Sequence, residues 1–221
     1  EQFITGTFVP SFMEKTNDKL LVSIEQNEIV FKSEAFTVSF DTASGKLSKL
    51  DYGDGNIILQ GISPNFWRAT TDNDYGFNMP KHLGVWKEVS EKQELVSIQL
   101  KDNGKILDLS SKEQISNFSS NIINLEVVYD LPNNIAKVKM SYKIEASGQL
   151  TVKNILTHVK NDLPNIPRFG SNFIVNKKFN RVNWYGRGPL ENYQDRKTSQ
   201  FIGDYKALVE DLYVPYIRPQ E

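Results

Sequence analysis

Sixteen consecutive residues near the end of the chain combine the side chains that most often bind ligands. The stretch 181–196 holds three aromatic residues, five charged residues, two glycines and a proline. Val182 and Trp184 alternate with polar residues, as in a half-buried strand, and residues 186–189 (Gly-Arg-Gly-Pro) are expected to break that strand. The loop that follows gathers carboxylates, an amide, a phenol and a guanidinium: Glu191, Asn192, Tyr193, Asp195 and Arg196.

This loop has two interpretations, and the residue types alone favour neither. A polar loop held by a strand is a common place for binding residues. Alternatively, the loop is held by its own ion pairs, in which a carboxylate of Glu191 or Asp195 meets the guanidinium of Arg187 or Arg196.

A second stretch, residues 66–76, contains three neighbouring side chains with oxygen ligands: Asp72, Asn73 and Asp74. Calcium is one hypothesis, but the spacing argues against it. An EF-hand loop needs glycine at its sixth position and a bidentate glutamate at its twelfth. Counted from the first aspartate, Gly76 is fifth and Leu83 is twelfth. We therefore expect no metal here, and instead an Asx-type turn in which these side chains bind nearby backbone N–H groups.

Paired carboxylates raise the hypothesis of glycoside hydrolysis, and the obvious pairs are Asp72 with Asp74 and Glu191 with Asp195. A retaining glycosidase needs its two carboxyl groups about 5 Å apart, and an inverting one about 6.5–9.5 Å. An exposed carboxylate beside an arginine usually has a lowered pKa, which is the wrong direction for a general acid. No catalytic residue is therefore predicted in this chain.

The sequence gives even less support to catalysis by cysteine, serine or histidine. The chain has no cysteine, and no serine lies in a nucleophile elbow. His82 and His158 match no acid–base motif. The three tryptophans could stack on sugar rings, but aromatic side chains more often fill a sandwich core, and Trp184 is expected there because its strand alternates.

Short alternating segments separated by turn residues run through most of the chain. Strands are expected at 20–24, 29–31, 36–40, 47–52, 57–59, 94–101, 105–109, 121–129, 135–145, 149–159, 171–176 and 213–217. No 3.6-residue period persists over three turns, and only 111–118 and 208–212 are expected to form a helical turn. The pattern predicts an all-β fold, a large many-stranded antiparallel sandwich.

Composition narrows the range of partners. The chain of 221 residues suits one large all-β domain or two small ones. Lys and Arg number 26 against 27 Asp and Glu, so no basic excess predicts nucleic acid as a partner. No apolar run is long enough to span a bilayer, so no membrane partner is predicted.

The two polar stretches resemble a known family. Residues 181–196 with 211–221 are similar to the C-terminal β-sandwich domain, of the small-chain type, in family 2 β-galactosidases. There the pattern reads Val-Asn-Trp, Gly-x-Gly-Pro, Glu-Asn-Tyr, x-Asp-Arg, then Tyr-x-Pro-Tyr. Residues 66–76 resemble the Arg-x-x-x-Asp-Asn-Asp-x-Gly motif of the same family. The resemblance covers about residues 35–221 and implies a supersandwich similar to galactose mutarotase.

The resemblance also implies a function. The parent enzyme hydrolyses terminal β-D-galactosides with retention, and both of its catalytic glutamates lie on a separate TIM-barrel domain. Nothing in this chain shows the βα alternation of a barrel. The chain would therefore need no cofactor of its own, and its partners would be the barrel domain and a galactoside at the domain edge. The implied rim or carbohydrate-binding residues are Arg68, Asp72, Asn73, Asp74, Arg187, Glu191, Asn192, Tyr193, Asp195 and Arg196.

Two alternatives belong to other functional classes. One is a free carbohydrate-binding module, in which the loops 66–76 and 187–196 form a sugar platform. The other is a self-standing sugar epimerase, which the histidines do not support.

The expected organisation has two parts. Residues 1–30 are predicted to connect from a preceding domain and to include a first strand or hairpin. Residues 31–221 are predicted to form the sandwich, incomplete at its C-terminus and therefore prone to self-association through an uncovered edge. The chain begins at Glu1 without a methionine or a leader-like segment and is therefore interpreted as a piece of a longer protein, so bacterial periplasm and cytoplasm both remain open.

Overall fold

The computed structural model describes residues 18–111, 115, 118–190, 192 and 197–213. These residues divide into two units. The larger unit holds the described residues up to Arg68 together with Lys81–Asn176, and the smaller unit holds Ala69–Pro80 and the described residues from Lys177 onward. Most of the expected connector, and nearly all of the strand expected at 213–217, lie outside the described residues.

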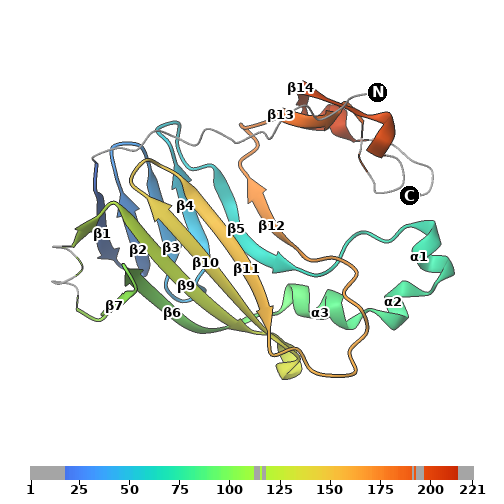
Figure 1. The fold of residues 1–221 in the computed structure, drawn as a ribbon, viewed down its shortest axis with the longest axis horizontal. Coiled ribbons are helices and arrows are strands. Elements are labelled where there is room, and N and C mark those ends of the chain that lie inside the picture. Colours follow the sequence, from blue (N-terminus) through green and yellow to red (C-terminus); the bar gives the residue numbers. More distant parts are fainter. Residues whose placement is uncertain (1–17, 112–114, 116–117, 191, 193–196, 214–221) are drawn as a thin grey trace. The chain divides into compact units, whose positions relative to one another are not determined.

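The first sheet of the larger unit has five antiparallel strands in the order β4-β3-β2-β1-β8 (Figure 1). Its strands are β1 (Leu20–Glu25), β2 (Glu28–Lys32), β3 (Thr37–Asp41), β4 (Leu47–Asp51) and β8 (Ser119–Ser120). Alternate positions are buried, as the period of two in the sequence requires. Ile29 and Phe31 on β2 are both fully buried, for example.

The second sheet also has five antiparallel strands, in the order β11-β10-β9-β6-β7. Its strands are β6 (Glu94–Asp102), β7 (Lys105–Leu107), β9 (Ile122–Asp130), β10 (Lys137–Glu145) and β11 (Leu150–Thr157). The turn between β6 and β7 has positive φ at both central residues, Asn103 (46°) and Gly104 (82°). This is the twist that a two-residue hairpin favours.

The two sheets share one hydrophobic core. The ring of Phe40 on β3 meets the ring of Tyr142 on β10 with centroids 4.7 Å apart. Tyr129 on β9 donates its hydroxyl hydrogen to the carbonyl of Ser44, 2.9 Å away, and burial raises the pKa of this tyrosine. The predicted all-β antiparallel sandwich is confirmed. The strands predicted between 94 and 176 each begin and end within two residues of the expected positions.

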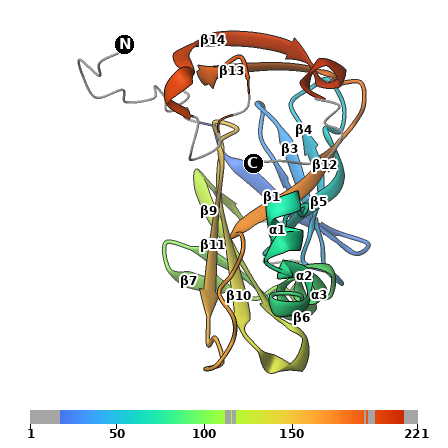
Figure 2. The ribbon, with the colours of Figure 1, turned by 90° about the vertical axis from the view of Figure 1, so that its right-hand side faces the viewer.

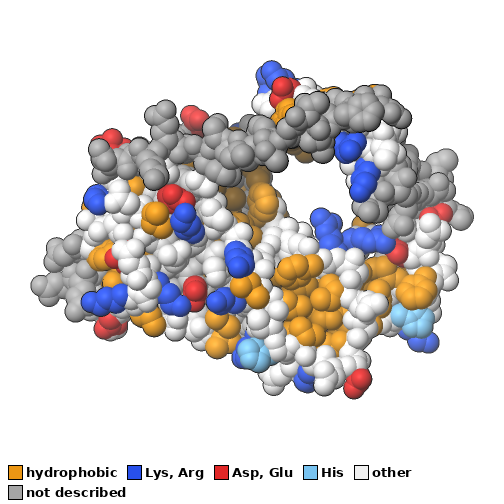
Figure 3. Space-filling model, in the orientation of Figure 1, with side chains coloured by type: hydrophobic (Ala, Val, Ile, Leu, Met, Phe, Trp, Pro, Cys, Tyr) orange, Lys and Arg blue, Asp and Glu red, His pale blue; other side chains and the backbone are white. Residues whose placement is uncertain are grey.

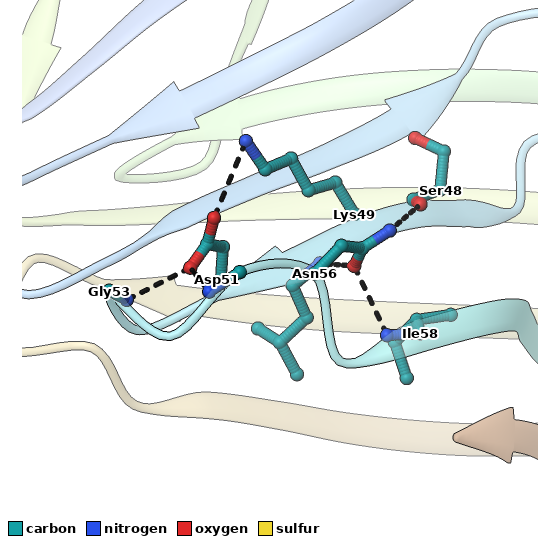
Figure 4. Close-up of polar contacts among 8 residues, drawn as sticks. Ser48, Lys49, Asp51, Gly53, Asn56 and Ile58 are labelled. Atoms are coloured by element: carbon teal, nitrogen blue, oxygen red, sulfur yellow. Dashed lines mark hydrogen bonds and ion pairs between the residues drawn. The ribbon is translucent and has the colours of Figure 1, made fainter. Parts of the chain in front are cut away.

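The connection between β4 and β5 (Ile58–Asn65) is held by two polar side chains (Figure 4). Asn56 accepts hydrogen bonds from the N–H of Leu50 and of Ile58, and donates to the carbonyl of Ser48. Asp51 accepts from the N–H of Gly53 and of Gly55, each 2.9 Å away. The bond from Gly53 is the main reason why the pKa of Asp51 lies below its usual value.

A separate two-stranded sheet pairs β5 (Ile58–Asn65) with β12 (Gly170–Val175). The prediction for β5 ended at residue 59 and was wrong, because Gly61 and Pro64 continue the strand instead of ending it. At Gly61 a Cβ atom would lie 2.1 Å from the carbonyl oxygen of Leu47, so only glycine fits there. Among the described residues β12 pairs with β5 alone.

Three helices were not expected from the sequence: α1 (Asp72–Gly76), α2 (Met79–His82) and α3 (Val85–Glu91). Each is too short to show a hydrophobic period over three turns. α3 buries only Trp86 and Val89, and the Trp86 indole donates to the carbonyl of Pro164. The described residues also form three 3₁₀ turns: η1 (Pro132–Asn134), η2 (Lys197–Ser199) and η3 (Val209–Leu212), of which η3 confirms the turn expected at 208–212. No helix in the described ranges is long and apolar enough to cross a membrane.

The smaller unit contains an antiparallel hairpin of β13 (Arg181–Gly188) and β14 (Phe201–Leu208) (Figure 2). The strand ends within residues 186–189, where a break was expected, but Gly186 itself does not break it. Gly186 pairs with Gly203, and the strand continues to Gly188, which pairs with Phe201. The ladder ends at Pro189, which has no N–H to donate.

The larger unit also exposes apolar side chains. On the face drawn in Figure 3, hydrophobic side chains gather around the place where Figure 1 draws α3. Near or on β12, Phe169, Phe173 and Ile174 are each more than half exposed. The predicted self-association through an uncovered edge stays a prediction.

Glu126→Gln is expected to lower the free energy of unfolding by about 1 kcal/mol at neutral pH. The Glu126 carboxylate lies 2.6 Å from the Lys101 ammonium and 3.8 Å from that of Lys139, on the two neighbouring strands. The hydrogen bond from Lys101 is the main reason why the pKa of Glu126 is lowered. A lowered carboxyl pKa stabilises the fold above the unfolded-state pKa, and this contribution is lost as the pH falls through the folded-state pKa.

Urea unfolding of both proteins at a series of pH values measures the difference, which should shrink in acid. Glu88→Gln is the control, because the Glu88–Lys92 ion pair is exposed and contributes little. A Glu126→Gln difference that stays constant down to strongly acidic pH contradicts the prediction.

Gly188→Ala is expected to destabilise the hairpin by about 1–3 kcal/mol through overpacking. A Cβ atom at Gly188 would lie 2.8 Å from Cδ2 of Tyr205, on the opposite strand. At Gly186, on the same strand, the nearest atom would be Cδ1 of Trp184 at an ordinary 3.6 Å, so Gly186→Ala is the matched control. Amide hydrogen exchange of β13 and β14 measures both variants. Equal protection in the two would show that the Tyr205 ring moves aside without cost.

Candidate functional site

The segment that leads into residues 66–76 is fixed by buried aromatic rings in the larger unit. Phe66 is fully buried, stacks on Phe169 and donates its N–H to the hydroxyl of Ser90, 2.8 Å away. The Asn65 side chain bonds both the N–H and the carbonyl of Trp67. Arg68, the first predicted rim residue, is the last residue of this part of the larger unit.

Asp72, Asn73 and Asp74 form the start of helix α1 in the smaller unit. Thr71 and Asp74 make a capping box, in which the Thr71 hydroxyl accepts from the N–H of Asp74 and the Asp74 carboxylate accepts from the N–H of Thr71. Asp72 accepts from the N–H of Asn73, 2.9 Å away. The expected Asx-type turn is thus corrected to a capped helix start, although the carboxylates bind backbone N–H groups as predicted.

The geometry of these carboxylates is that of a helix cap. Asp74 directs one oxygen at the backbone N–H of Thr71, at 2.9 Å. Within the described residues no group of three or more His, Asp or Glu side chains gathers as metal ligands do. The absence of metal, and the convergence of Arg68 with Asp72 and Asp74, stay predictions.

The second predicted site begins at Arg187 on β13. One guanidinium nitrogen of Arg187 donates to the carbonyls of Lys197 (3.1 Å) and Gln200 (2.8 Å). These two bonds join the end of β13 to the residues just before β14. Among the described residues, the Arg187 side chain therefore binds the backbone and stabilises this end of the hairpin. Glu191, Tyr193, Asp195 and Arg196 lie outside the described residues, so the hypothesis of ion pairs within the loop stays a prediction.

The main-chain carbonyl of Arg187 organises the neighbouring side chains. It accepts the indole N–H of Trp184 at 3.0 Å and the side-chain amide of Asn192 at 3.2 Å. The same amide also donates to the carbonyl of Leu190. An indole and an amide side chain, those of Trp184 and Asn192, thus both donate to one carbonyl oxygen.

Trp184 is not a core residue, contrary to the expectation. It is half-buried and packs against Tyr205, the residue opposite it on β14, with ring centroids 5.4 Å apart. Trp184 also lines a cleft of about 380 Å³. Val182, Trp184 and Leu212 are among its apolar lining residues, and Arg187, Pro189, Leu190, Asn192 and Asp211 complete the lining.

Asp211 was missed as a site residue. It lies on η3, which begins directly after β14 and is joined to the start of β13 by the bond from the N–H of Val209 to the carbonyl of Asn180. Asp211 and Trp184 are thus brought together by hairpin pairing over 27 residues, and no local motif could signal this. The histidines are not part of this cleft: His82 ends α2 and His158 follows β11.

Comparison with known proteins finds a consistent set of relatives. Residues 32–221 match the family model described as the β-galactosidase small chain. A β-galactosidase from Priestia megaterium is 30% identical over 90% of this chain, and one from Pseudoalteromonas haloplanktis is 27% identical over 96%. A β-galactosidase small subunit from Latilactobacillus sakei is 28% identical over 95%.

The lengths of these relatives differ from that of the chain. The chain spans 18% of the Priestia protein, 20% of the Pseudoalteromonas protein and 66% of the Latilactobacillus subunit. The match to the family model includes both polar stretches, 66–76 and 181–221, that carry the resemblance in the sequence. The chain belongs to the β-galactosidase small chain family.

Proposed function

We propose that this chain is the C-terminal sandwich of a β-galactosidase that hydrolyses terminal β-D-galactosides with retention, and that it is not catalytic alone. The observation that carries the proposal is the family match over residues 32–221. In the proposed organisation, residues 1–30 connect to a preceding domain and residues 31–221 form the sandwich. The catalytic glutamates belong to a TIM-barrel domain outside this chain.

The chemistry of the described carboxylates supports a role without catalysis. Retaining hydrolysis needs a nucleophile and a general acid about 5 Å apart, on opposite sides of the scissile bond. Asp72 and Asp74, the described one of the two candidate pairs, both accept hydrogen bonds from backbone N–H groups at the start of α1. Carboxylates used in this way stabilise a helix start, which suits a structural element at the edge of a substrate site.

The proposed role of α1 is that of a rim. The capping box fixes the helix start, while Tyr75 and Phe77 are 65% and 63% exposed. Exposed aromatic side chains next to a fixed helix start suit contact with a sugar or with the surface of another domain. We assign this rim role to Arg68, Asp72, Asn73 and Asp74, and to the second loop with Arg187, Asn192 and residues 191, 193, 195 and 196.

A second candidate function is a free carbohydrate-binding module. The observation that favours it is the cleft beside Trp184, which lies within one unit of this chain. Binding of sugar by the chain alone, without hydrolysis, is the property that separates this candidate from a purely supporting domain.

The coding sequence that precedes Glu1 provides the test of the main proposal. It is expected to encode a TIM barrel, and the full protein is expected to hydrolyse a nitrophenyl β-D-galactoside. Deleting residues 1–221 from that protein should abolish turnover, because one wall of the active site is then missing. The 221-residue chain, assayed by itself, should release no nitrophenol.

Two further measurements sharpen the test. Adding the chain to the deleted protein should restore turnover, and proton NMR of the first product should show the β-anomer that retention requires. Hydrolysis by the chain alone that is lost in Glu191→Gln would overturn the proposal. Full activity of the deleted protein would do the same.

A further inference from the structure

We propose that the cleft between β13 and η3 binds a single pyranose ring, with Trp184 as its apolar wall and with Asn192 and Asp211 as hydrogen-bond acceptors. The choice of a saccharide as the ligand class rests on the proposed function. The geometry of the cleft is independent of that proposal.

The apolar wall is rigid. Val182 and Trp184 are two residues apart on β13 and therefore lie on the same face of the strand. Tyr205 packs against the Trp184 ring, and the bond from the indole N–H to the Arg187 carbonyl fixes the ring orientation. A half-buried indole held on two sides loses little entropy when a ligand stacks on it.

The polar side of the cleft offers acceptors. Asp211 makes no ion pair or hydrogen bond with any described residue, and it is exposed. Asn192 also lines the cleft, and its amide nitrogen donates to the carbonyls of Arg187 and Leu190, so its oxygen is the atom that can accept from a ligand. Acceptors of this kind suit a ligand that carries several hydroxyl donors.

Size and charge narrow the ligand further. A cleft of about 380 Å³ lies at the small end of the range for small-molecule sites, which is roughly 300–1,000 Å³. Arg187 also lines the cleft, but its guanidinium donates to the carbonyls of Lys197 and Gln200, whereas the Asp211 carboxylate is exposed and disfavours an anionic ligand. A pyranose presents an apolar C–H face to an aromatic ring and hydroxyl groups around its edge, so it matches both sides of the cleft. An organic cation is the main competing ligand, because aromatic rings and carboxylates also bind cations.

The test is an NMR titration of the ¹⁵N-labelled 221-residue chain with methyl β-D-galactoside. The chain has three tryptophans, so the spectrum holds three indole N–H signals, and Trp184→Phe identifies the relevant one. That signal should shift, with a dissociation constant of about 1 mM, while the signals of Trp67 and Trp86 stay in place. Asp211→Asn should weaken binding about tenfold, because a hydrogen bond to a charged acceptor is replaced by a neutral one.

The controls separate a site from a general effect. Asp204→Asn makes the same chemical change on β14 outside the cleft and should leave the affinity unchanged. Sorbitol, which has hydroxyl groups but no ring face, should not shift the Trp184 signal. The inference is overturned if galactoside leaves that signal unmoved, if Asp211→Asn binds as tightly as the unchanged protein, or if choline shifts the signal and galactoside does not.

The outcome does not depend on hydrolysis. If the chain restores turnover to the deleted parent enzyme while the Trp184 signal stays unmoved, the proposed function holds and the sugar site is refuted. If the signal shifts as expected and the parent shows no hydrolysis, the cleft remains a sugar site and the proposed function fails.

Discussion

Contact between the inner faces of the two five-stranded sheets is the constraint on which the larger unit depends. Phe40 and Tyr142 meet across this interface, and Tyr129 adds a hydrogen bond to the carbonyl of Ser44, in the turn between β3 and β4 of the other sheet. A Cβ atom at Gly45 would lie 2.5 Å from Cγ1 of Val127, so the second sheet reaches the turn after β3 at a distance that only glycine permits. A slip of one residue would turn every inner side chain outward, so this packing also fixes the register of the strands.

The smaller unit is stabilised in a different way. Among its described residues Met79 is the only buried hydrophobic side chain, and a two-stranded hairpin is marginally stable in water on its own. Side chains bonded to backbone carbonyls hold it instead: Trp184 and Asn192 to Arg187, Arg187 to Lys197 and Gln200, and Tyr205 to Phe201. Because hydrogen bonds hold this unit instead of a hydrophobic core, its aromatic rings are not buried and can contact a ligand. Binding sites are commonly found on loops of this kind.

The sequence predicted the sandwich well because its strands follow the physics of alternation. The inward residues of β9 and β10 repeat every second position, and Asn103-Gly104 has the composition of a hairpin turn. The short helices were missed because a four- to seven-residue helix shows no period, and α1 is encoded by one capping box. The continuation of β13 through Gly186 was missed because glycine was interpreted as a break, whereas Gly203 opposite it leaves room for regular pairing.

The candidate site could be predicted only in part, for the same physical reason. Trp184, Arg187 and Asn192 are close in sequence, so their types alone mark the loop, and the structure joins them at one carbonyl oxygen. Asp211 reaches the cleft because eight residue pairs align β14 with β13. In addition, the N–H of Val209 donates to the carbonyl of Asn180. Its position is therefore a consequence of the hairpin register and has no local signature. It follows that a substitution that disturbs this register, even on the strand face away from the cleft, would separate Asp211 from Trp184 and remove the acceptor from the apolar wall.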